Sequence, residues 1–134
     1  MGLKLPKLLH NLDCEPLGYP GLTVTFWLNP TYTDHEFPWD GIEDEKERDT
    51  VRRAAIKAEP WIDEYHFLTS RIVEAVTFPA EMTDGGEPLR VEIPDARAMY
   101  DLMTTPGFEQ RIMVWAWEQY NRERDDWRQD ARKN

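Results

Sequence analysis

The chain has 134 residues and a formal net charge of −10, and 40% of its residues are hydrophobic. The hydrophobic content excludes a wholly disordered polypeptide, and the length predicts a single domain spanning residues 1–134 with a modest core. The acidic balance disfavours phosphate backbones and anionic membranes, so we expect no nucleic-acid or membrane partner.

The cysteine content and the start of the chain indicate a cellular compartment. The single cysteine, Cys14, cannot form an internal disulfide, which indicates reducing conditions. The first residues lack the apolar core and the cleavage site of a secretory signal, and no apolar run is long enough to span a bilayer. We therefore expect a soluble protein of the cytoplasm.

Residues 1–42 are predicted to form β structure and loops, because five of the ten prolines lie there and exclude long helices. The clearest strand pattern covers residues 22–28, where apolar and other side chains alternate: Leu22, Val24, Phe26 and Leu28 against Thr23, Thr25 and Trp27. Pro20 and Pro30 flank this segment and remove ladder donors, which predicts a small sheet or an edge strand.

Residues 43–134 are predicted to be mainly helical, beginning with a charged helix that runs to about Ala58. Asp40 followed by Glu43 matches a capping box at its start. Acidic residues crowd the first half and basic residues the second, which complements the helix dipole. Few apolar residues mark a face, so we predict a solvent-exposed helix, with an acidic binding surface as the alternative.

Three further elements are predicted before the last helix. Apolar residues recur at helical spacing over 61–76 and predict a core-facing helix. The Asp-Gly-Gly turn at 84–86 precedes the alternating run 89–93, which predicts a short strand or extended arm. A brief helix over 95–102 follows, opened by a Pro-Asp pair.

The final helix is predicted to begin with Thr105 as its N-cap and Pro106 at its first helical position. One side of this helix carries an apolar and aromatic stripe: Phe108, Ile112, Trp115, Ala116 and Tyr120. From about residue 121 the chain becomes polar with mixed charge, which predicts a projecting or a frayed helix end.

Together these elements predict a mainly α-helical α+β domain with a short N-terminal β segment. The predicted core combines side chains from the strand and from the two apolar stripes: Val24, Phe26, Leu68, Ile72, Ile112 and Trp115. Trp61, at the start of the first stripe, is also predicted to be buried.

No pattern in the sequence indicates catalysis. The three histidines are far apart and no Cys-x-x-Cys or His-x-x-x-His spacing occurs, so we expect neither a metal nor a cofactor. Adjacent acids such as Asp125 and Asp126 point apart on a helix, which is unsuited to shared acid–base work. We expect a non-enzymatic protein.

The aromatic residues of the final helix point instead to protein binding. Six tryptophans are many for so short a chain, and tryptophan is enriched at interface hot spots. Trp117 and Trp127 lie at the edge of the core stripe or beyond it. We predict a protein-binding set of Met113, Trp117, Tyr120 and Trp127.

Several segments carry a family resemblance: the strand that ends in Leu28-Asn29-Pro30, the central apolar helix, the segment Thr83-Asp84-Gly85-Gly86-Glu87-Pro88-Leu89, and Ile93-Pro94 before a terminal helix. Their order resembles the small tail assembly chaperones of long-tailed bacteriophages, in the shorter form encoded just before the tape-measure gene. The resemblance covers roughly residues 18–125. The extra Gly86 and the long Trp-rich final helix depart from the family pattern.

The resemblance implies a non-enzymatic protein that binds the helical tape-measure protein, keeps its apolar surfaces soluble and helps recruit tail-tube subunits. Many members also occur in a longer form made by translational frameshifting. Two alternatives remain open: a structural virion component, such as a head–tail connector or minor tail protein, and an acidic inhibitor that mimics nucleic acid. Interspersed lysines and arginines weaken the second alternative, and homo-oligomerisation is left open.

Overall fold

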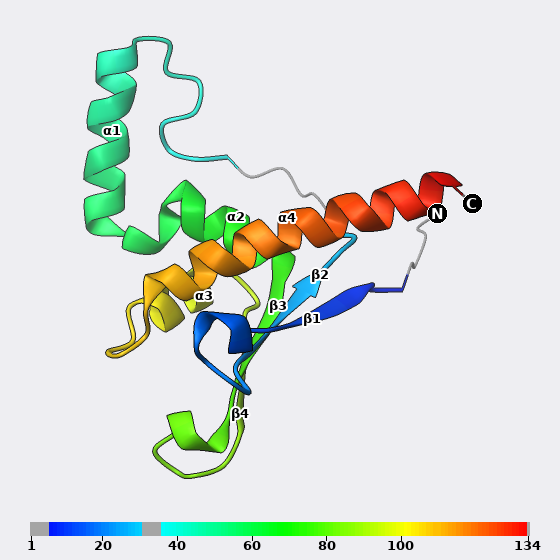
Figure 1. Cartoon of the computed structure of the whole chain (residues 1–134). Helices are drawn as coiled ribbons and strands as arrows, with labels where there is room; N and C mark the ends of the chain where they lie inside the picture. Colours follow the sequence, from blue (N-terminus) through cyan, green and yellow to red (C-terminus); the bar gives the residue numbers. More distant parts are fainter. Residues whose placement is uncertain (1–5, 31–35, 134) are drawn as a thin grey trace.

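The computed structural model describes residues 6–30 and 36–133, and it confirms a mainly helical α+β domain. The strands form one antiparallel sheet in the order β1-β2-β3-β4, and Figure 1 shows the helices gathered around its upper part. The strands are β1 (Leu9–Asp13), β2 (Thr23–Trp27), β3 (Val73–Phe78) and β4 (Leu89–Glu92). The helices are α1 (Glu45–Ala58), α2 (Glu64–Ile72), α3 (Ala96–Met103) and α4 (Gln110–Lys133).

The core lies between one face of the sheet and the helices. Val24 of β2 pairs with Leu12 of β1 and with Val76 of β3, so these side chains share that face. They belong to or pack against a buried cluster that includes Ile72 of α2, Met99 of α3 and residues of α4. The opposite face carries the alternate residues, several of them polar: Asn11, Thr23, Thr25, Thr77, Arg90 and Glu92.

The best-predicted strand lies in a small sheet of four strands, one of the two alternatives that its flanking prolines predicted. β2 lies between β1 and β3 and is an interior strand, so the edge alternative is wrong. The paired segment Thr23–Trp27 ends before Pro30 and begins after Pro20, so neither proline interrupts a ladder. The partner β1 has little alternation and was not predicted.

The helix predicted over 61–76 is confirmed in its middle part and wrong at both ends. Pro60–Ile62 forms a short 3-10 turn, α2 ends at Ile72, and β3 begins at Val73. The change from helix to strand follows from pairing with β2, because Val76 lies beside Val24 and Thr77 beside Thr23. β-Branched residues favour the strand once such a partner is present.

Two predicted helix starts are also corrected. Asp40 accepts a hydrogen bond from the Phe37 backbone N–H at 2.7 Å and closes a loop turn, while Asp44 caps α1. The Thr105 hydroxyl donates to the Asp101 carbonyl at 2.7 Å, at the end of α3. Gly107 then has a φ of 90°, so the chain leaves helical geometry before α4 begins at Gln110.

The predicted core is confirmed at four positions: Val24, Phe26, Ile72 and Ile112. Trp115 is partly buried and packs against this core, and Trp61 is half-buried. Leu68 is wrongly predicted, because 45% of it is exposed on the outer side of α2. The short strand β4 and the brief helix α3 are confirmed, with Asp95 capping α3 through the Ala98 N–H.

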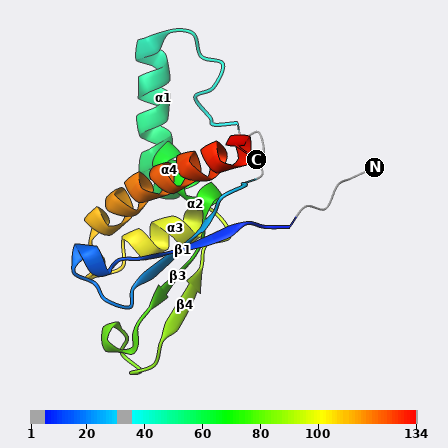
Figure 2. The same cartoon turned by 45° about the vertical axis from the view of Figure 1, so that its right-hand side comes forward.

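Helix α1 confirms the prediction of a solvent-exposed helix, since none of its residues is buried. Figure 1 and Figure 2 both show it standing away from the sheet. The buried Trp39 holds it from the preceding loop, with the Arg52 guanidinium 5.8 Å from its ring centroid. The Trp39 indole N–H in turn donates to Glu64 at the start of α2 at 3.2 Å.

Candidate protein-binding surface

The inner side of α4 belongs to the core. Ile112, Ala116 and Tyr120 recur every four residues, and with Met113 they are at most 2% exposed. The Tyr120 ring stacks on Phe26 with centroids 4.9 Å apart, and its hydroxyl donates to the Trp27 carbonyl at 3.4 Å. These contacts fix the first half of the helix against β2.

This geometry corrects two members of the predicted protein-binding set. Met113 and Tyr120 are each 1% exposed, so neither can contact a partner in this conformation. Helical spacing showed correctly that they share a side with Ile112, but it did not show that the sheet covers that side as far as Tyr120.

The other two members reach the surface. Trp117 is partly buried, with its ring centroid 6.3 Å from that of Tyr120, and Trp127 is 39% exposed. Between them lies Arg124, whose guanidinium is 5.6 Å from the Tyr120 ring centroid. We call Trp117, Arg124 and Trp127 the α4 aromatic surface.

Trp127 extends the buried side of α4 past the core. Seven residues are close to two helical turns, so Trp127 lies almost in line with Tyr120 and about 10 Å farther along the axis. Figure 1 and Figure 2 show this half of α4 extending toward the end of β2 and the start of β1. One aromatic side chain, Trp127, therefore lies in line with the buried side of α4 but beyond its buried part.

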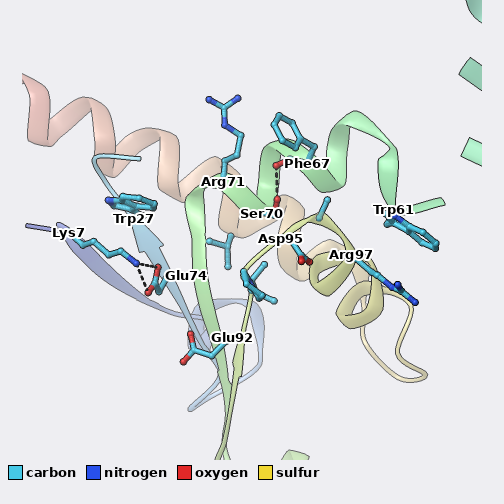
Figure 3. Close-up of a pocket in the computed structure, with 14 residues that line it drawn as sticks. Lys7, Trp27, Trp61, Phe67, Ser70, Arg71, Glu74, Glu92, Asp95 and Arg97 are labelled. Atoms are coloured by element: carbon cyan, nitrogen blue, oxygen red, sulfur yellow. Dashed lines mark hydrogen bonds and ion pairs between the residues drawn. The ribbon is translucent and has the colours of Figure 1, made fainter. Parts of the chain in front are cut away.

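A second candidate is a groove that the sequence did not indicate, with a volume of about 810 Å³. Figure 3 shows Trp27 at one side and Trp61 at the other, with Phe67 of α2 between them. The Lys7 ammonium bonds Glu74 at 3.2 Å and lies 5.0 Å from the Trp27 ring centroid, and the Arg97 guanidinium lies 4.8 Å from that of Trp61.

The charges that line this groove balance, three bases against three acids: Lys7, Arg71 and Arg97 against Glu74, Glu92 and Asp95. Such a lining has no excess charge that would select a phosphate or a metal ion. Its residues come from separate segments of the chain, so no local pattern could have revealed it.

A third feature, a cleft of about 730 Å³, lies between α1 and the loop before it. Its charged lining mixes four acids with three bases: Asp40, Glu45, Asp49 and Glu64 with Lys46, Arg48 and Arg52. Asp49 also forms an ion pair with Arg53 at 2.9 Å. The acidic half of α1 is thus interspersed with bases, as the sequence indicated.

Cys14 is a buried thiol. It is fully inaccessible, and burial raises its pKa to about 11, with the nearby Asp13 charge acting in the same direction. The thiol is therefore protonated at neutral pH, whereas a nucleophile or metal ligand has to be a thiolate.

The environment of His66 leads us to expect that stability depends on pH. Its Nδ1 is buried and has no hydrogen-bond partner among the described residues, and its ring lies 5.3 Å from that of Tyr100. Burial lowers the pKa of His66, and the Asp63 charge acts in the opposite direction. The folded state thus favours the neutral imidazole.

Because the folded-state pKa lies below the unfolded value of about 6.5, the unfolded state binds more protons in the interval between them. The His66 contribution to stability is therefore complete above about pH 6.5 and is lost as the pH falls through the folded-state pKa. We expect His66→Gln to weaken this fall, measured by urea denaturation near about pH 7.5 and about pH 5. Parallel pH profiles for both proteins would contradict the assignment.

Within residues 6–30 and 36–133, no three or more His, Cys, Asp or Glu side chains are grouped to hold a metal ion. In the same part of the chain, no helix combines the length and apolar character needed to cross a membrane. Comparisons with protein-family models, with curated proteins and with solved structures find no match. The function is therefore inferred from the residues, their geometry and the family resemblance.

Proposed function

We propose that the chain is a non-enzymatic tail assembly chaperone of a long-tailed bacteriophage. In this role it binds the tape-measure protein and helps recruit tail-tube subunits in the host cytoplasm while virions assemble. The resemblance in the order of the segments supports this role. The observation that carries the proposal is the α4 aromatic surface, where the exposed Trp127 lies in line with the buried side of the helix.

The physical reason lies in the unequal environments of the α4 side chains. A tryptophan that is 39% exposed leaves apolar area in water, and a partner helix packed along α4 would remove that area from solvent. Arg124 beside the rings supplies a charged rim to the same surface. Tryptophan anchors of this kind commonly contribute about 2 kcal/mol or more to binding.

The test is co-purification with a helical segment of the tape-measure protein. Trp127→Ala is expected to raise the dissociation constant by about tenfold or more, because a loss of about 1.4 kcal/mol of binding free energy corresponds to each factor of ten. Val114→Ala is the matched control, since Val114 is 52% exposed on another side of the same helix. Circular dichroism of both variants should match that of the unmodified protein.

Undiminished binding by a folded Trp127→Ala variant would remove the α4 aromatic surface from the interface. If the unmodified protein failed to bind any tape-measure segment, the chaperone proposal itself would fail. Mass spectrometry of purified virions separates the structural alternative, because a chaperone leaves the particle and a connector or minor tail protein stays. The bases interspersed along α1 give no support to a nucleic-acid mimic.

A further inference from the structure

The outer edge of β1 is open for backbone pairing. The Leu8 carbonyl accepts from the Leu28 N–H at 2.7 Å and the Cys14 N–H donates to the Leu22 carbonyl at 2.8 Å, so even-numbered residues pair with β2. Successive residues of a strand direct their N–H and C=O groups to opposite sides, so those of Leu9, Asn11 and Asp13 point away from β2 at the open edge. Among the described residues, no other backbone segment pairs with this edge.

The opposite edge of the sheet is protected in ways that β1 is not. β4 is four residues long, and Pro88 and Pro94 flank it closely. Its outward residues Arg90 and Glu92 form an ion pair at 2.6 Å. Prolines and charges are the usual means of blocking edge-to-edge pairing. β1 has five residues with no proline among them, and Leu9 is 47% exposed.

The β1 edge is also complementary to itself. If two copies run antiparallel about an axis at His10, Leu8 of each copy lies opposite Leu12 of the other, on the face that the helices cover. On the opposite face Lys7 lies opposite Asp13, and the two Leu9 side chains become diagonal neighbours. Shifting the axis to Asn11 would instead place Leu9 opposite Asp13, which matches an apolar side chain with a charge.

We infer that a second copy of this chain pairs antiparallel with β1 about a two-fold axis at His10. The two four-stranded sheets become one continuous sheet of eight strands. A closed two-fold interface requires a patch that is complementary to itself, and this register meets that requirement in both its apolar and its charged pairs. The edge carries one base and one acid, Lys7 and Asp13, so the overall charge of −10 is not concentrated there.

Sedimentation velocity over a range of protein concentrations tests the association. The unmodified chain is expected to form a dimer. Leu9→Pro removes an outward N–H without touching the ladder to β2, and Leu9→Lys places a charge beside the axis, so both variants should shift the protein to monomer. Leu89→Lys, at an exposed leucine on the β4 edge, is the matched control and should leave the dimer intact.

Disulfide trapping tests the register. With the buried Cys14 replaced by Ala, His10→Cys should form a symmetric disulfide under mild oxidation, because directly opposed non-hydrogen-bonded residues have Cα atoms about 4.5 Å apart. Asp13→Cys should not, because the two copies of that residue would lie about 20 Å apart. A monomer at every concentration, a dimer unaffected by both folded Leu9 variants, or equal trapping at residues 10 and 13 would overturn the inference.

Discussion

Phe26→Ala is expected to lower the free energy of unfolding by about 3–5 kcal/mol, the range for truncating a buried aromatic side chain. Phe26 is fully buried in the interior strand β2, and its ring stacks on Tyr120 of α4. Truncation leaves a cavity where the sheet meets the longest helix, so the lost contacts include those that hold α4 in place.

Urea denaturation at fixed protein concentration measures this change. Leu89→Ala, at a side chain that is 52% exposed on β4, is the control and should change the free energy by no more than about 0.5 kcal/mol. If both variants showed the same midpoint, Phe26 would not be the link between sheet and helix that the stacking indicates.

Ile72→Ala and Leu68→Ala form the second pair, because both residues lie on α2 but face different surroundings. Ile72 is 6% exposed within the core cluster, so its truncation should cost about 2–5 kcal/mol. Leu68 is 45% exposed, so its truncation should cost less than about 1 kcal/mol. The sequence pattern placed both residues in the core; a large loss for Leu68→Ala in a denaturation experiment would restore that prediction.

Local patterns predicted most of the elements whose causes are local. The alternating segment at 89–93 became β4, Asp95 became the cap of α3, and the apolar stripe of the last helix became the buried side of α4. In each case spacing or capping chemistry within a few residues determines the structure.

The errors arose where a distant partner decides the structure. Residues 73–76 fit a helical stripe, but the Val76 backbone pairs with Val24, and that pairing makes the segment a strand. Local spacing contains no information about a partner so far away along the chain. β1 was missed for the same reason, because its pairing with β2 rather than its own composition makes it a strand.

The candidate site shows the same division between local and distant causes. Helical spacing identified the side of α4 that carries Met113, Tyr120 and Trp127. It did not show that Tyr120 is buried against Phe26 of β2 while Trp127 is 39% exposed. The groove between Trp27 and Trp61 depends wholly on tertiary structure, because its lining is assembled from segments that are separate in the sequence.

The position of α1 outside the core cluster has a consequence for how the molecule opens. Because none of its residues belongs to the core cluster, this helix can unravel without uncovering that cluster, so its amide protons should exchange with solvent through small local openings. The amides of β2, between two strands and beneath α4, exchange only when the whole domain unfolds. A protease added to the native protein would accordingly cut first near α1 and leave two resistant fragments, one with β1 and β2 and the other with β3, β4 and α4.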